Sequence, residues 1–179
     1  MTIAPNETAK RIQQIRTNAI FGKKKHYNAA DRKQRYQSII GMLVISINVV
    51  LGSAFLLLLK ESVPEYVKWG GAILALMAAL LATFQNYFGY QKKIQGHRVV
   101  AGQYLDVMHQ CSNALAAHSD RAITDAQLVA KLEKLTLLMA KIDSDAHAYP
   151  TNDADFQLAR SGIENGEEEY TSQDLRAGS

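Results

Sequence analysis

Apolar residues concentrate in two uninterrupted runs, residues 39–59 and 69–90, separated by a connector of nine residues. Neither run contains Lys, Arg, Asp or Glu. A helix rises about 1.5 Å per residue, so about 20 apolar residues cross the ~30 Å hydrocarbon core of a bilayer. Each run therefore predicts a transmembrane helix, and the short connector predicts a hairpin. The alternative is the buried hairpin of a soluble domain, but helices of this length that are apolar on all sides are rare there.

The polar remainder of the chain brings the mean hydropathy to −0.14 and hides the two runs. Residues 1–38 predict a basic amphipathic helix that starts near Ala9 and is interrupted at Gly22. Residues 91–148 predict a helical hairpin whose first helix continues from the second span without a break. Its second helix begins at Thr124, with Gln127 in capping-box register. The predicted apolar seams are Ile94, His97, Ala101, Tyr104, Met108, Cys111 and Leu115 on the first helix, and Leu128, Leu132, Leu135, Met139 and Ile142 on the second.

Residues 149–179 are acidic and contain few apolar residues, so we expect a mostly disordered tail. The alternative is that this tail binds a partner. The fold class predicted for the whole chain is an all-α membrane protein, in which a two-transmembrane hairpin (spans 39–59 and 69–90) lies between an N-terminal amphipathic helix and a C-terminal cytosolic helical hairpin.

Charge placement predicts the orientation of the hairpin. Nine basic and two acidic residues precede the first span, whereas the charge of the connector is balanced. Basic flanks stay in the cytoplasm, so both termini are expected there. The aromatic residues Tyr66, Trp69, Tyr87 and Tyr90 are placed as interfacial anchors. The residues expected to meet lipid headgroups are Lys23, Lys24, Lys25, Arg32, Lys33 and Arg35.

Small and polar residues form a stripe on each span. The first stripe consists of Gly41, Ile45, Asn48, Gly52 and Phe55, and the second of Gly71, Ala75, Ala78, Ala82, Gln85 and Gly89. Small residues let helix backbones approach closely in lipid, so these stripes are the predicted packing surfaces. Asn48 has two possible roles. It either forms a hydrogen bond that joins helices, within the hairpin or between protomers, or it lines a pore. Ser46 and Ser53 add a thin second polar face.

The sequence predicts neither catalysis nor a cofactor. It has no glycine-rich phosphate loop, nucleophile elbow, CxxC or HExxH pattern, and its five histidines are scattered, so no metal site is expected and each histidine is taken as solvated or as part of the core. Cys111 is the only cysteine and is expected to be a small core residue. The basic segment lies beside a membrane span, so anionic lipid explains it better than nucleic acid, and no direct binding of nucleic acid is expected.

Several features in this order resemble the SLATT domain of bacterial two-transmembrane proteins associated with nucleotide-signalling conflict systems. They are the basic helix with residues 25–33 (KHYNAADRK), the Ser-containing first span, the short connector, the second span, and residues 90–94 (YQKKI) entering a long helical hairpin. The most specific part of this resemblance is the short stretch Tyr27-Asn28-Ala29 before the first span. The resemblance covers residues from about 9 to 145.

The resemblance implies a multi-pass protein of the bacterial inner membrane that acts as an antiviral effector. In this interpretation the chain forms a homo-oligomer and permeabilises or depolarises the membrane once a partner is triggered, which ends in abortive infection. The chain has no recognisable sensing domain, so the expected partner is a sensor or nucleotide-synthesising enzyme encoded nearby, a cyclic-oligonucleotide synthase or a reverse transcriptase. The alternative is a non-conducting membrane scaffold that recruits a soluble enzyme.

Overall fold

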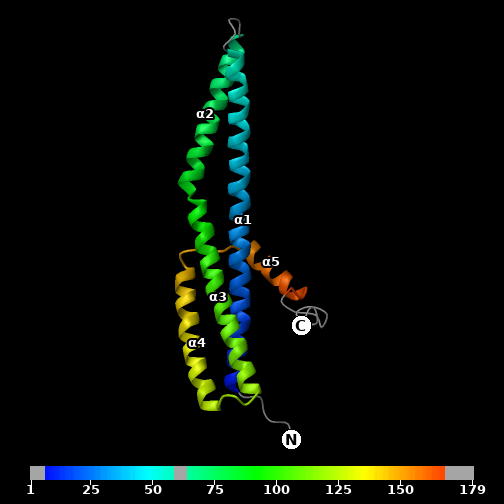
Figure 1. Cartoon of the computed structure of the whole chain (residues 1–179), viewed down its shortest axis with the longest axis vertical. Coiled ribbons are helices and arrows are strands. Elements are labelled where there is room, and N and C mark those ends of the chain that lie inside the picture. Colours follow the sequence, from blue (N-terminus) through cyan, green and yellow to red (C-terminus); the bar gives the residue numbers. More distant parts are fainter. Residues whose placement is uncertain (1–6, 59–63, 168–179) are drawn as a thin grey trace. The chain divides into compact units, whose positions relative to one another are not determined.

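The computed structural model describes residues 7–58 and 64–167, which form five helices and contain no strand (Figure 1). The helices are α1 (Glu7–Leu58), α2 (Glu65–Phe88), α3 (Tyr90–Ser119), α4 (Asp125–Ala146) and α5 (Asp153–Glu164). The chain divides into two compact units. Unit 1 comprises residues 1–30 and 95–179, and unit 2 comprises residues 31–94. The all-α fold class is confirmed.

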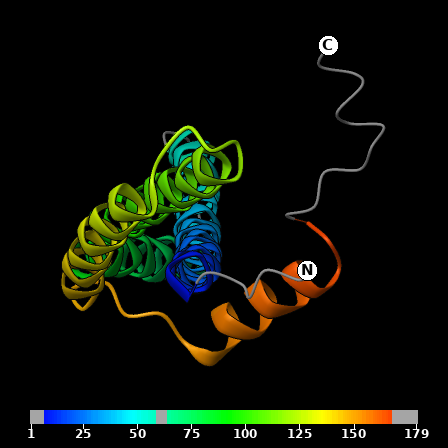
Figure 2. The same ribbon diagram turned by 90° about the horizontal axis from the view of Figure 1, so that it is seen from below.

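Unit 1 is built around a core shared by the first part of α1, α3 and α4 (Figure 2). The α4 residues Leu128, Leu135 and Ile142 recur every seven residues and are almost completely buried. The part of the predicted α3 seam that belongs to unit 1 is also covered, because His97, Ala101, Tyr104 and Cys111 are buried and Met108 and Leu115 are partly buried against the same core. Ile94, the last residue of unit 2, is buried as well. Burial of these apolar side chains is the main force holding unit 1 together.

Cys111 is fully buried in this core, as the sequence predicts. Burial raises the pKa of its thiol to about 11. Burial also raises the pKa of Tyr104, and the hydrogen bond that its hydroxyl donates to Asp143, 2.7 Å between oxygens, raises it further.

Gly22 does not interrupt α1, contrary to the sequence prediction, since the helix is continuous through it. The physical reason is close packing. A Cβ atom at position 22 would lie 2.7 Å from the Tyr104 ring, so glycine makes room for a buried aromatic side chain.

Helix α4 starts where the sequence predicts. Thr124 lies at the N-cap, and its side-chain oxygen accepts a hydrogen bond from the backbone N–H of Gln127, while the side-chain oxygen of Gln127 accepts one from the backbone N–H of Thr124. Such a reciprocal pair satisfies two backbone donors that a helix start leaves unpaired.

The tail expected to be disordered contains a helix, α5, which corrects the prediction for residues 153–164. Asn152 and Asp155 form a second capping box. The helix packs on α1, where the rings of Phe21 and Phe156 stack at 5.9 Å and the Asn28 amide donates to the Asp155 carbonyl at 3.1 Å. The acidic composition is therefore compatible with order because α1 supplies an apolar and hydrogen-bonding partner. Residues 168–179 lie outside the described part of the chain.

A third correction concerns the junction after the second span. The helix does not continue unbroken, because Gly89 adopts a left-handed conformation with φ 55° and ends α2 before α3 begins at Tyr90. The Gly89 N–H donates to the Asn86 carbonyl, and its own carbonyl accepts from the Lys93 N–H, both at 3.2 Å. Glycine adopts this conformation without the steric cost of a side chain.

Candidate functional site

Unit 2 is the predicted hairpin, and one face of each helix is covered by the other. On α2 the covered face consists of Val67, Gly71, Leu74, Ala78, Leu81, Ala82 and Gln85. Ala78 is the most buried of these, with 6% of its surface exposed. The predicted α2 stripe therefore lies at the interface within the hairpin, apart from Ala75, which is exposed, and Gly89, which ends the helix.

The covered face of α1 differs from the predicted stripe. It consists of Gln37, Ile40, Gly41, Val44, Ile47 and Leu51, which are partly buried. Of the predicted residues only Gly41 lies there, whereas Ile45, Asn48 and Gly52 are exposed. Phe55 lies among the residues whose side chains are not described. The two covered faces are complementary in size, since that of α1 consists mainly of large aliphatic residues and that of α2 includes the small residues Gly71, Ala78 and Ala82.

Three amide side chains lie at the end of the hairpin opposite the connector: Gln37, Gln85 and Gln91. A Cβ atom at Gly41 would lie 3.8 Å from Nε2 of Gln85, in ordinary van der Waals contact, so position 41 faces this amide. Gln37 donates a hydrogen bond of 2.8 Å to the Gln91 side-chain carbonyl. Both contacts join segments that are far apart in sequence, and both fix the register of α1 against the returning chain.

The polar residues of the exposed faces bond to their own helix. Asn48 donates to the Val44 carbonyl at 2.9 Å, and Ser53 donates to the Val49 carbonyl at 2.9 Å. Ser46 is exposed. The Asn48 side chain therefore does not join α1 to α2 within one hairpin. A hydrogen bond between protomers and the lining of a pore are the roles that are left for it.

The outer surface of the hairpin is apolar. Exposed large side chains include Met42 (69%), Ile45 (65%) and Leu76 (62%). Two helical stretches are long and apolar enough to cross a membrane, and at most 6% of their apolar windows is buried within the structure. Such a surface in water would aggregate, whereas in lipid it is solvated. Tyr66, Trp69 and Tyr87 are exposed near the ends of α2, and Tyr90 is partly buried.

The basic residues expected at lipid headgroups do not share one environment. Lys23, Lys24 and Lys25 belong to unit 1 and are partly covered, and Lys24 forms an ion pair with Glu167. Arg32, Lys33 and Arg35 belong to unit 2, where Arg35 is exposed and the other two are partly covered.

Unit 1 also contains a buried histidine pair, and the sequence did not predict that these two residues meet. Nδ1 of His26 lies 3.1 Å from Nδ1 of His97, and both side chains are at most 2% exposed. One ring must donate and the other accept, so a neutral pair satisfies this geometry. The sequence contains a pattern that predicts the burial of both rings. His97 belongs to the predicted α3 seam, and His26 follows Ile12 and Ala19 at intervals of seven residues. Within the described residues, no three His, Cys, Asp or Glu side chains are grouped so that they could hold a metal ion.

The covered face of α2 gives a testable prediction. Ala78→Leu should disturb the hairpin, because a larger side chain at a closely packed position costs about 1–3 kcal/mol. With Gly41→Cys and Gln85→Cys in a Cys111→Ala background, the yield of the crosslink between positions 41 and 85 should fall. Ala79→Leu is the matched control, because Ala79 is next to Ala78 in the sequence but is exposed. An equal yield in both variants would contradict the packing described here.

Comparison with protein families agrees with this architecture. The family model described as SMODS and SLOG-associating 2TM effector domain family 4 matches residues 9–174. Searches among curated proteins and among solved structures found no match. The family match spans both membrane helices, the core of unit 1 and α5, which extends the resemblance noted above beyond residue 145. With two helices able to cross a bilayer and a family match over nearly its whole length, this chain is a membrane protein that belongs to the SLATT two-transmembrane effector domain family.

Proposed function

We propose that this protein is the membrane effector of a bacterial anti-phage defence system. It oligomerises in the inner membrane and permeabilises or depolarises it when a partner is triggered. The family supplies the role of membrane effector in conflict systems. The exposed face of the hairpin supports the proposed assembly and the proposed path through the bilayer.

The observation that carries this proposal is the uncovered stripe on the first span. Asn48 and Gly52 place a polar and a small residue one turn apart on the first span, and both are exposed in the single hairpin, as is Ile45 on the same face. An amide that faces hydrocarbon is costly unless it finds a partner. The bond to Val44 satisfies one amide hydrogen, and the exposed carboxamide oxygen can accept from a second hairpin or from water in a lumen. A second copy of this chain places a comparable surface against the stripe.

The scaffold alternative rests on a different surface. Helix α4 of unit 1 exposes Leu137 (73%) and Val129 (43%) opposite its core face, and these side chains could receive a soluble partner enzyme. A scaffold needs one packing face in each hairpin, which α1 and α2 already provide for each other. It leaves the Asn48 stripe without a role, so we favour the permeabilising effector.

The partner that triggers the effector is proposed to be encoded nearby. The family description associates these domains with SMODS and SLOG proteins. A cyclic-oligonucleotide synthase fits that association, and a reverse transcriptase is the other candidate partner.

The proposed topology places both termini in the cytoplasm. Unit 1 joins residues before the hairpin and residues after it in one core, which supports a topology in which both ends of the hairpin lie on the same side of the membrane. The basic residues ahead of the first span then select the cytoplasmic side.

This topology predicts the pattern of thiol labelling. In a Cys111→Ala background, Glu65→Cys should react with a membrane-impermeant thiol reagent in intact cells, because Glu65 starts α2 beside the connector and is exposed. Lys141→Cys, at an exposed position of α4, should react only after lysis. Labelling of position 141 from outside would overturn the orientation.

The direct test of function is membrane potential in living cells. Cells that express the chain together with its genomic neighbour should depolarise and take up an impermeant dye when the system is triggered, whereas cells with the chain alone should not. Triggered cells that stop growing with a normal membrane potential would support the scaffold instead.

A further inference from the structure

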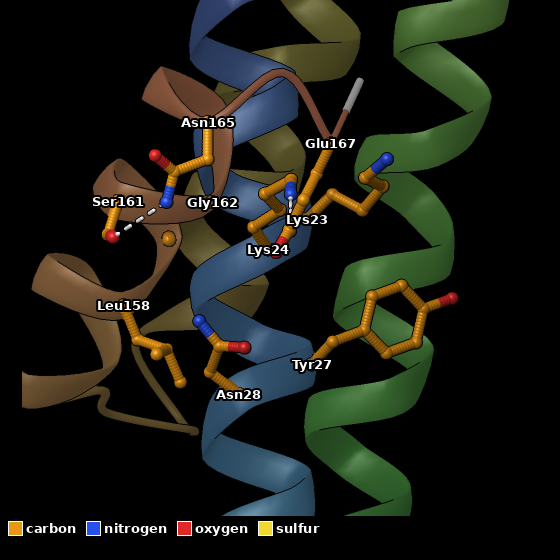
Figure 3. A pocket seen from close by; sticks show the side chains of 10 residues that line it. Lys23, Lys24, Tyr27, Asn28, Leu158, Ser161, Gly162, Asn165 and Glu167 are labelled. Carbon is orange, nitrogen blue, oxygen red and sulfur yellow. Dashed lines mark hydrogen bonds and ion pairs between the residues drawn. The ribbon is translucent and has the colours of Figure 1, made fainter. Parts of the chain in front are cut away.

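A cleft in unit 1 is lined by residues that carry charge and hydrogen-bonding groups and that have no place in the function proposed above. It lies between α1 and α5 and has a volume of about 500 Å³ (Figure 3). Lys23, Lys24, Tyr27 and Asn28 line it from α1, and the residues from α5 and the segment after it are Leu158, Ala159, Ser161, Gly162, Asn165 and Glu167. Tyr27 and Asn28, which belong to the local stretch that carries the family resemblance, are therefore part of its wall.

Lys24 is the central cation of the cleft. Only 11% of its side chain is exposed, and its ammonium group pairs with the carboxylate of Glu167. A cation so far removed from water requires an anion beside it. In Figure 3 the two side chains meet in the middle of the cleft.

Glu167 is an anion supplied by the chain itself, and it is held in place by the end of α5. Its N–H donates to the Gly162 carbonyl at 3.1 Å, and Gly166 turns the chain with φ 79°. A Cβ atom at Gly162 would collide with the Glu167 carboxylate, so glycine at 162 lets this carboxylate lie against the helix. Yet the Glu167 side chain is 64% exposed, so it is the exchangeable member of the pair.

Charge in the cleft favours a ligand more anionic than a carboxylate. Two lysines and one glutamate line it, which gives a formal charge of +1 with Glu167 in place. A phosphate group that replaced the Glu167 carboxylate could carry two negative charges and accept hydrogen bonds through more oxygens. Ser161 and the amide of Asn165 supply neutral hydrogen-bonding groups on the α5 side.

We infer that the cleft between α1 and α5 binds a phosphate group, with Lys24 as the principal cation and Glu167 as an internal competitor. The phosphate belongs either to a soluble small molecule or to the headgroup of an anionic lipid. Binding exchanges the carboxylate for the phosphate and releases the segment after α5 from Lys24. The inference concerns unit 1 alone and does not depend on whether the hairpin conducts.

The test uses the full chain in nanodiscs of zwitterionic lipid, titrated with inorganic pyrophosphate by calorimetry. Lys24→Gln should weaken binding, whereas Glu167→Gln should tighten it by about fivefold, the factor that corresponds to losing a competing ion pair whose carboxylate is exposed. Lys141→Gln, an exposed lysine of α4 outside the cleft, is the control and should leave binding unchanged. Opposite effects of the two variants distinguish a ligand site from a structural ion pair, which either variant would only weaken.

A second arm identifies the source of the phosphate. The same variants are placed in nanodiscs that contain phosphatidylglycerol, and the lipid retained after detergent extraction is counted by native mass spectrometry. Tighter pyrophosphate binding by Glu167→Gln supports a soluble ligand, and greater lipid retention by the same variant supports a headgroup. If Glu167→Gln, with an unchanged melting curve, alters neither measurement, the inference is overturned. This outcome leaves the depolarisation test unaffected.

Discussion

Leu135→Asp is expected to unfold unit 1, whereas Leu137→Asp, two residues along the same helix, is expected to leave it folded. Leu135 is 3% exposed in the core shared by α1, α3 and α4, and Leu137 is 73% exposed. Loss of a buried leucine costs about 2–5 kcal/mol, and burial of an unpaired carboxylate adds to this. The total approaches the ~5–15 kcal/mol by which a domain is stable.

The measurement is limited proteolysis of the full chain in detergent, followed by mass spectrometry of the fragments. In Leu135→Asp, cleavage should appear within residues 95–167 at protease concentrations that leave the parent intact. Leu137→Asp should resemble the parent. Equal resistance of the two variants would show that Leu135 is not in the core of the folded protein.

Asn48→Leu is expected to remove most of the depolarising activity without reducing insertion. Leucine makes the span more apolar by a few kcal/mol on insertion scales, so the protein should reach the membrane at normal levels. A hydrogen bond between membrane helices contributes ~1 kcal/mol. Because Asn48 is exposed in each hairpin, a symmetric assembly would lose such a contact at every interface, and these losses compound.

Membrane potential is measured in triggered cells at matched protein levels. Val50→Leu is the control, because Val50 is also exposed on the first span but carries no polar group. Full depolarisation by the Asn48→Leu strain would exclude a required role for the amide. Toxicity that survives Asn48→Leu but is lost in Leu137→Asp, with no depolarisation at any stage, would favour the scaffold.

The membrane helices and the core of unit 1 could be predicted because each depends on a local pattern. Runs without charge predict spans, and the spacing of Leu128, Leu135 and Ile142 predicts a buried face. The capping box at Thr124 is likewise a local signal and is confirmed. These features depend on residues that are near one another in sequence.

The features that sequence reasoning missed depend on contacts between distant segments. Gly22 resembles a helix breaker until the ring of Tyr104 is placed against it. Helix α5 is short and acidic, and its order follows from Phe21 and Asn28, more than 120 residues earlier. On α1, two stripes are compatible with packing, and only the three-dimensional arrangement shows that Gly41, Val44 and Ile47 face α2 while Asn48 does not.

The discontinuous makeup of unit 1 has a consequence for the order of events during biosynthesis. Ile12 and Ala19 leave the ribosome early, but their core partners on α3 and α4 are made only after both spans. The N-terminal apolar face therefore waits, unpaired, while the hairpin is inserted, and this delay favours chaperone binding or aggregation. An insertion error that leaves the two ends on opposite sides of the membrane would prevent the core from forming at all. Degradation of an unassembled unit 1 would then act as quality control, removing misinserted copies of the protein.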